Sequence, residues 1–91
     1  MITNIRNRYT QDVIFTGDYP DLKAAVEAAV KQKVSLQYAD LWGANLLGAD
    51  LQDAYLFRAD LRNADLRGAD LRNANLYYAD LREANLQDAK L

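Results

Sequence analysis

Leucine recurs at every fifth residue from Leu36 to Leu91, and from Ala39 onward an alanine stands two residues before each leucine. The position between them holds Asp or Asn in every block except those with Tyr55 and Lys90. A period of five would spread leucines around all sides of an α-helix and alternate them between the two faces of a strand. The pattern therefore predicts short extended segments joined by corners, with Ala and Leu pointing inward and successive coils stacked as a solenoid.

The ten full blocks between residues 39 and 88 resemble the repeats of the pentapeptide-repeat family. The resemblance implies an all-β solenoid, a right-handed quadrilateral β-helix with about twenty residues per coil. Residues 34–91 would then form somewhat under three coils. Asp or Asn before each leucine can hydrogen-bond the backbone at a corner, and Gly43, Gly48 and Gly68 relax the turn at the last position of their blocks.

The first 33 residues follow different patterns. Residues 2–9 and 13–16 are rich in β-branched and aromatic residues and predict a β-hairpin, which residues 17–20 break. Asp21 is the expected N-cap of a helix from residue 22 to about residue 33. Its apolar stripe and its charged opposite face are spaced at helical intervals; the stripe consists of Leu22, Ala25, Val26, Ala29 and Val30, and the opposite face of Lys23, Glu27 and Lys31.

A helix directly before the first coil is well placed to cover the open end of a solenoid. We therefore expect residues 1–33 to form a hairpin and capping helix and residues 34–91 to form the repeat region, within one structural domain. The first segment also resembles leaders of pentapeptide-repeat proteins from bacterial and phage genomes, through residues 7–10, 13–15 and 22–31. The alternative of a separate ligand-binding domain is disfavoured, because 33 residues cannot bury a core alone.

Residues twenty apart should stack on the same side of the solenoid, and one side then gathers aromatic residues around a central arginine. A structural interpretation is a ladder of rings that stiffens the solenoid, with Arg58 between Tyr38 and Tyr78 in cation–π contact. A functional interpretation is a protein-binding patch, because Tyr, Phe and Arg are enriched at interaction hot spots. The candidate interaction face consists of Tyr38, Tyr55, Phe57, Arg58, Tyr77 and Tyr78.

The other sides carry columns of Asp with arginines two residues later, which predict a solvated lattice of ion pairs. Carboxylates repeated along a convex surface define no pocket, so we do not expect this chain to be an enzyme. Some members of the family mimic DNA and bind type II topoisomerases, protecting them from fluoroquinolones, and this is the alternative function. The charge balance over residues 39–91 is weak, at nine acidic and six basic residues. The sequence contains no contiguous basic stripe, so we do not expect it to bind nucleic acid directly.

Composition narrows the remaining chemistry. The chain has 91 residues, a formal net charge of −2, no Cys and no His, which removes disulfides, thiolate chemistry and ordinary zinc sites. We expect no cofactor. No apolar run approaches the length of a membrane span and the start lacks a secretory apolar stretch, so the expected location is cytoplasmic and without a membrane partner.

The last block stops at Leu91, which would leave the leucines of the final coil near solvent. We expect two chains to form a homodimer through this end, using Leu81, Leu86 and Leu91; a frayed monomeric end or a chain cut from a longer protein are the alternatives. The sequence thus predicts a non-enzymatic structural or protein-interaction module that presents a rigid β-helix surface. It does not identify the protein partner.

Overall fold

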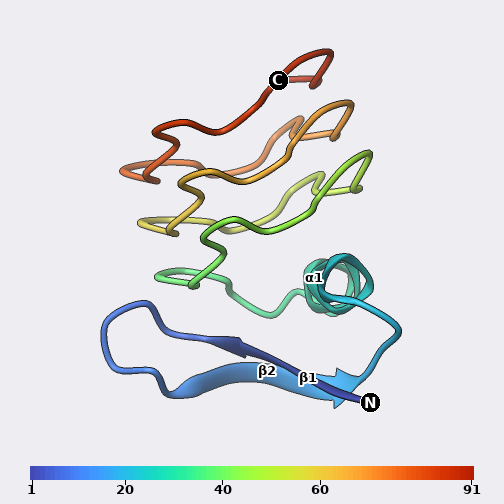
Figure 1. The fold of residues 1–91 in the computed structure, drawn as a ribbon, viewed down its shortest axis with the longest axis vertical. Helices are drawn as coiled ribbons and strands as arrows, with labels where there is room; N and C mark the ends of the chain where they lie inside the picture. Colours follow the sequence, from blue (N-terminus) through green and yellow to red (C-terminus); the bar gives the residue numbers. More distant parts are fainter.

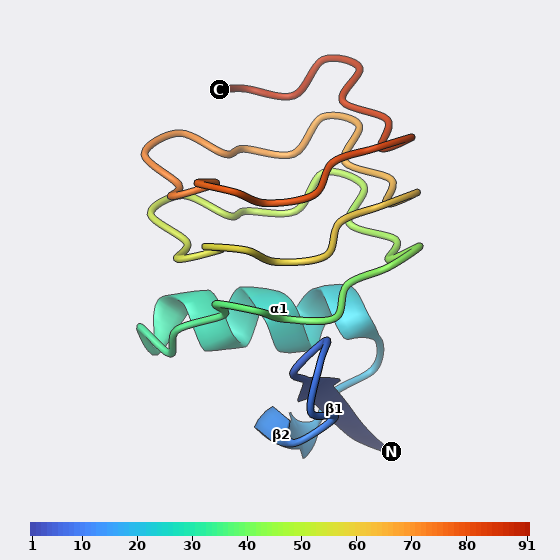
Figure 2. The same ribbon diagram turned by 90° about the vertical axis from the view of Figure 1, so that its left-hand side faces the viewer.

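The computed structural model describes residues 1–91, arranged as a hairpin, a helix and a stack of coils along one axis (Figure 1). Strands β1 (Ile2–Arg6) and β2 (Val13–Asp18) form the hairpin at one end. Helix α1 (Leu22–Lys31) lies between the hairpin and the first coil, crosswise to the stacking axis (Figure 2). The C-terminus lies at the far end of the stack. No helix in the structure combines the length and the apolar character needed to cross a bilayer.

The hairpin is antiparallel, with a register shift between Ile5 and Arg6. Its strands differ from the prediction at both ends, because β1 stops at Arg6 and β2 continues to Asp18. The expected break at residues 17–20 therefore begins later. Gly17 pairs with Thr3 in the sheet, and a Cβ at this position would lie only 2.4 Å from the Tyr19 ring. The glycine thus makes room for an aromatic side chain rather than ending the strand.

Helix α1 begins as predicted, because the Asp21 carboxylate accepts a hydrogen bond from the Ala24 N–H at 2.8 Å. It ends at Lys31, two residues before the predicted end. Lys33 has a φ of 60°, and the Val34 N–H reaches back to the Ala29 carbonyl at 2.9 Å. This closing pattern usually places glycine at the left-handed position, and here a lysine occupies it.

The repeat region buries its alanines and leucines as predicted. From Leu36 to Leu71 each leucine at the centre of a block is at most 3% exposed, and the alanines between them are at most 4% exposed. Ala25, Val26 and Ala29 of α1 belong to the same core, so the core continues from the helix into the coils. Leucines of the last coil, such as Leu81 and Leu86, are only partly buried.

Each corner has the same local structure. The leucine carbonyl accepts a hydrogen bond from the alanine N–H three residues later, as in the 3.0 Å bond from Ala59 to Leu56. The last residue of every block, whether glycine or not, has a φ between 56° and 67°. A positive φ at the third residue of a four-residue turn is the requirement of a type II turn. The expected role of Gly43, Gly48 and Gly68 is confirmed, although other residues accept the same conformation elsewhere.

Successive coils pair residue by residue at an offset of twenty. Parallel bridges join Asp40 to Asp60 and Asp60 to Asp80, and further bridges join the other sides in the same way. The sequence predicts an all-β solenoid, whereas β1 and β2 are the only regular strands and the coils pair through isolated bridges. The reason is geometric, because each side offers only one bridging residue before the next corner.

The N-terminal elements complete the hydrogen bonding of the first coil. The Asp40 N–H donates to the Arg6 carbonyl at 2.7 Å, and the Arg8 N–H donates to the Tyr38 carbonyl at 2.7 Å. The Glu27 carboxylate accepts from the Asp50 N–H at 2.8 Å. Glu27 is half-buried and faces the first coil, a contact that its helical spacing does not indicate. The carboxylate gives the Asp50 N–H the acceptor that a preceding coil would otherwise supply.

Candidate interaction surface

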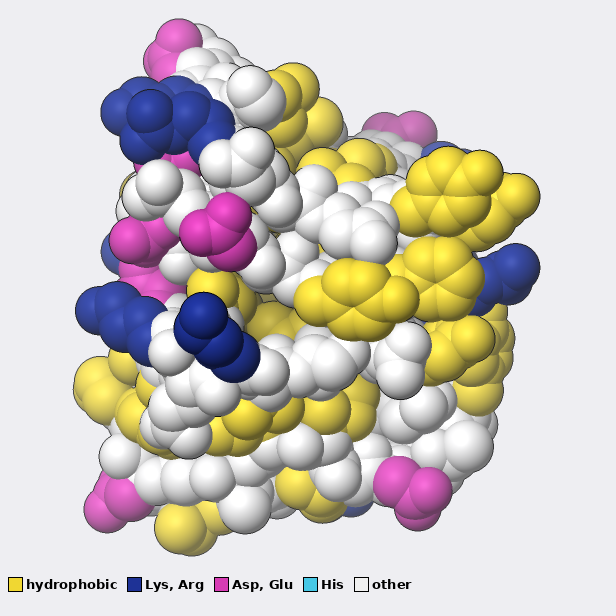
Figure 3. All heavy atoms as spheres, turned by 180° about the vertical axis from the view of Figure 1, so that it is seen from behind, with side chains coloured by type: hydrophobic (Ala, Val, Ile, Leu, Met, Phe, Trp, Pro, Cys, Tyr) yellow, Lys and Arg dark blue, Asp and Glu magenta, His cyan; other side chains and the backbone are white.

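One side of the repeat region brings together aromatic residues from three successive coils. Tyr38, Arg58 and Tyr78 stand at the last position of their blocks, Phe57 and Tyr77 at the fourth position, and Tyr55 at the second. The hairpin adds a ring that the repeat spacing does not indicate, because Tyr9 lies 6.0 Å from Tyr38 between ring centroids. We define the aromatic surface as these residues: Tyr9, Tyr38, Tyr55, Phe57, Arg58, Tyr77 and Tyr78. Figure 3 shows hydrophobic side chains gathered on one side of the coils and charged side chains on the other.

Phe57 is the centre of the aromatic surface. Its ring lies nearly parallel to those of Tyr55 and Tyr77, at centroid distances of 6.3 and 6.4 Å and interplanar angles of 13° and 11°. It meets Tyr38 and Tyr78 edge to face at 6.0 and 6.2 Å. Tyr77 and Tyr78 meet edge to face at 4.4 Å. Offset and edge-to-face pairs of this kind are favourable, so the rings hold one another in place.

Arg58 occupies a different position from the one expected. Its guanidinium carbon lies 4.9 Å from the Tyr78 ring centroid and 5.6 Å from that of Phe57. The expected contact with Tyr38 on the other side is not made, because Tyr38 packs against Tyr9 and Phe57 instead. Arg58 is therefore held by two rings of the coils rather than inserted between two tyrosines.

The aromatic surface remains open to solvent despite these contacts. Tyr77, Tyr78 and Tyr55 are 64%, 63% and 41% exposed, while Phe57 is half-buried beneath them. The hairpin borders this surface through Arg8, whose guanidinium donates to the Arg58 carbonyl at 3.0 Å. Nothing in the sequence placed Tyr9 and Arg8 here, since the approach of the hairpin to the coils depends on tertiary structure.

The other sides of the coils contain regular pairs of aspartate and arginine. In each pair the Asp Oδ1 accepts from the Arg backbone N–H and Nε, and Oδ2 accepts from Nη2; for Asp80 and Arg82 these distances are 3.2, 2.9 and 2.6 Å. The same geometry recurs in three further blocks, at Asp60 and Arg62, Asp65 and Arg67, and Asp70 and Arg72. The predicted lattice of ion pairs is present, and it neutralises four of the acidic side chains.

These pairs lower the pKa values of their carboxylates. The hydrogen bond from the Arg82 side chain lowers the pKa of Asp80 to about 2, against desolvation, which acts in the opposite direction. For Asp60 the side-chain hydrogen bond from Arg62 is likewise the largest cause of a lowered pKa. Asp60 is the one buried charged residue, and Arg8 of the hairpin approaches its Oδ2 to 3.9 Å. Each of these carboxylates is held by the arginine two residues later in its own block, so the pairs support the corners of the coils.

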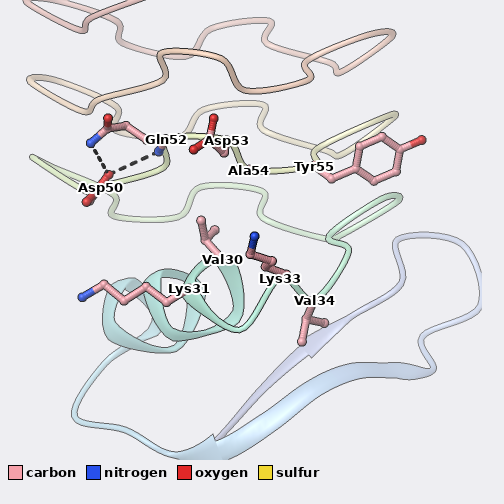
Figure 4. Close-up of a pocket in the computed structure, with 9 residues that line it drawn as sticks. All are labelled: Val30, Lys31, Lys33, Val34, Asp50, Gln52, Asp53, Ala54 and Tyr55. Carbon is pink, nitrogen blue, oxygen red and sulfur yellow. Dashed lines mark hydrogen bonds between the residues drawn. The ribbon is translucent and has the colours of Figure 1, made fainter.

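A groove of about 530 Å³ lies where α1 meets the first and second coils (Figure 4). Lys31 and Lys33 line the groove on the side of the helix, and Asp50, Asp53 and Tyr55 line it on the side of the coils. Asp50 is hydrogen-bonded by its neighbour Gln52 rather than by a lysine. The two lysines and two aspartates leave the groove without net charge. It adjoins the aromatic surface through Tyr55.

The predicted dimer end lies apart from the aromatic surface. Leu81 and Leu86 are partly buried in the last coil, and Leu91 is 78% exposed. Self-association through these residues stays a prediction.

Two comparisons with known proteins agree with the repeat pattern. The family model for pentapeptide repeats matches residues 32–56 and 54–91, with eight copies. The crystal structure of a pentapeptide repeat protein from the Arabidopsis thaliana thylakoid lumen is similar to this chain, at 55% sequence identity and a TM-score of 0.51. The similarity covers 52% of this chain and 32% of that protein, so this chain spans about a third of the length of that relative. None of the curated proteins matches the chain.

Proposed function

Since the chain belongs to the pentapeptide-repeat family, we propose that it is a non-enzymatic protein-interaction module built on a right-handed, four-sided β-helix. The family supplies the handedness and the four sides, and the stacking at an offset of twenty residues is consistent with both. In this proposal the coils are a rigid support and the aromatic surface is the part that contacts a partner protein.

The observation that carries the proposal is the exposure of the aromatic surface. Tyr77 and Tyr78 belong to a cluster of rings that is already ordered by contacts within the chain, yet both remain more than half exposed. Tyr and Arg are, together with Trp, the residues most enriched at the energetic centre of protein interfaces. Rings that are held before binding lose little conformational entropy on association, which favours affinity.

Mimicry of DNA, the alternative function, has less support. A DNA mimic needs an extended surface of strong negative charge. In this chain four aspartates are paired with arginines at 2.6–2.7 Å, so the acidic columns are largely neutralised. An assay of gyrase supercoiling in the presence of a fluoroquinolone tests this alternative, and rescue of supercoiling by the protein would favour it over the aromatic surface.

The proposal is tested by comparing partner capture by four forms of the full chain. These are the unmodified protein, Phe57→Ala, Tyr77→Ala and the control Trp42→Ala, whose ring is 58% exposed outside the aromatic surface. A captured protein is then purified and titrated against each form. We expect its affinity to fall for Phe57→Ala and Tyr77→Ala and to persist for Trp42→Ala. Equal affinity for all four forms would contradict the proposal.

A further inference from the structure

Arg58 differs from the other arginines of the repeat region in having no acidic partner. Arg62, Arg67, Arg72 and Arg82 each bind the aspartate two residues earlier, with Nη2 to Oδ2 distances of 2.6–2.7 Å. Arg58 stands one position later in its block, where the backbone has a φ of 57°, and two residues earlier it has Leu56 instead of an aspartate. No carboxylate lies within 4.0 Å of its guanidinium, and its side chain is exposed.

The unpaired guanidinium is nevertheless held in place. The rings of Tyr78 and Phe57 lie 4.9 and 5.6 Å from its guanidinium carbon, within the range of cation–π attraction. Arg8 donates to the Arg58 carbonyl at 3.0 Å and so ties the backbone of this residue to the hairpin. Arg58 therefore presents several N–H donors at the edge of an apolar surface. Because contacts within the fold already order its side chain, the side chain loses less conformational entropy on binding.

The nearby basic side chains do not offer the same site. Arg8 is 15% exposed and directed toward the carboxylate of Asp60, at 3.9 Å. Lys31 and Lys33 line the groove next to Tyr55, but Asp50 and Asp53 line the same groove and offset their charge. The only cation on the aromatic surface that is both exposed and free of a carboxylate is thus Arg58.

We infer that the aromatic surface binds an acidic peptide segment of a partner protein, with a carboxylate of the partner on the guanidinium of Arg58 and apolar side chains of the partner against Tyr55, Phe57 and Tyr77. A carboxylate accepts two parallel hydrogen bonds from a guanidinium, and a cation without an internal partner has no such bond to give up on binding. Neighbouring rings exclude water and strengthen the interaction. This inference rests on the proposed function and specifies the chemistry of its partner.

The test is a selection of phage-displayed random dodecapeptides on the 91-residue chain, followed by titration of the selected peptides as synthetic molecules. We expect the selected sequences to be enriched in Asp or Glu beside an apolar residue. Arg58→Gln should weaken binding of these peptides about tenfold, as expected for loss of a charged hydrogen bond. Arg58→Lys should restore only part of the affinity, because lysine keeps the charge and lacks the planar fork.

Lys23→Gln is the matched control, because it makes the same change in net charge on α1, outside the aromatic surface. Its affinity for the selected peptides should stay within about twofold of the unmodified protein, and raising salt from about 50 to about 500 mM should weaken binding to the unmodified protein more than to Arg58→Gln. Circular dichroism of each variant checks that the fold is retained.

Other outcomes would overturn the inference. The first is a selection that yields no binding peptide. The second is a set of selected peptides without acidic enrichment. The third is an equal loss of affinity for the acidic peptides in Arg58→Gln and in Lys23→Gln. Peptides without acidic residues whose binding is lost in Tyr77→Ala would overturn the inference while leaving the proposed interaction function intact. A doubling of the chain's mass that Arg58→Gln abolishes would assign the surface to a second copy instead of a different protein.

Discussion

The burial of Leu56 leads to a quantitative prediction about the core of the stacked coils. Leu56 is fully buried, its N–H donates to Asn75 of the next coil at 2.9 Å, and its carbonyl closes the corner at Ala59. In Leu56→Ala the loss of three carbon atoms costs about 2.4 kcal/mol, at about 0.8 kcal/mol for each carbon. A remaining cavity of roughly 50 Å³ adds about 1.2 kcal/mol, at about 24 cal/mol per Å³. We therefore expect the free energy of unfolding to fall by about 3.5 kcal/mol.

Leu47→Ala provides the matched control for this prediction. It makes the same chemical change at a fourth position of a block, where the side chain is 47% exposed. Its loss should cost less than about 1 kcal/mol, because part of the side chain is already in water and no closed cavity forms. The pair thus separates inward from outward positions without changing the residue type.

The assay is urea unfolding at neutral pH followed by circular dichroism. The slope of the free energy with urea should be the same for both variants and the unmodified chain, because it reports the surface exposed on unfolding. A lower slope would show that the coils unfold in parts, as repeat arrays can. Equal losses of stability in Leu56→Ala and Leu47→Ala would refute the assignment of the leucines to the interior.

Three further predictions concern other parts of the structure. Because the pKa of Asp80 is lowered in the folded state to about 2, its pair with Arg82 stabilises the fold above about pH 4 and loses this effect as the pH falls toward 2. The urea midpoints of the unmodified protein and Arg82→Gln should therefore differ at pH 6 and converge near pH 2; a constant difference would exclude this linkage. Gly48 has a φ of 66°, and a Cβ at this position would meet no atom within 4 Å. Gly48→Val should therefore lower the free energy of unfolding by about 1–2 kcal/mol through backbone strain alone, and Gly48→Asn by clearly less, as measured by urea unfolding. Equal losses in the two variants would argue against a left-handed corner. If two chains pair through the last coil, light scattering should give twice the chain mass for the unmodified protein and the monomer mass for Leu86→Arg, whereas an unchanged dimer mass in the variant would exclude this interface.

The repeat region could be predicted closely from the sequence because every block repeats the same pattern of inward and outward positions. An Ala and a Leu at a fixed spacing can be buried together only if the chain turns after each block, and the burial of Ala59 and Leu61 agrees with this. The pattern predicts short extended segments, and it does not indicate that the coils pair at isolated bridges instead of in regular strands. Pairing at isolated bridges depends on how few residues separate two corners, which the hydrophobic pattern alone does not specify.

The aromatic surface was predictable in its membership but not in its contacts. Stacking at an offset of twenty places Phe57 above the first coil and below Tyr77, and the structure brings these rings together. The contact of Tyr9 with Tyr38 joins residues from the hairpin and the first coil, so no repeat spacing could indicate it. Once Tyr9 occupies that side of Tyr38, Arg58 packs on Tyr78 and Phe57.

The role of Glu27 shows a similar limit. Helical spacing places this residue on the face opposite the apolar stripe of α1, and it does not indicate a contact with the first coil. The first coil has no coil beneath it, and its Asp50 N–H needs an acceptor from another element. The hydrophobic pattern carries no information about this requirement, because it depends on which backbone donors of the first coil face the helix.

If the aromatic surface binds a partner as proposed, its rings contribute more to recognition than to stability. The most direct measurement is Tyr77→Ala, assayed in parallel for the free energy of unfolding and for affinity toward a partner or selected peptide. The ring is 64% exposed, so we predict a loss of stability below about 1 kcal/mol together with a loss of affinity of about tenfold or more. A loss of about 2 kcal/mol or more in stability with unchanged affinity would contradict the claim and identify the rings as a stiffening ladder.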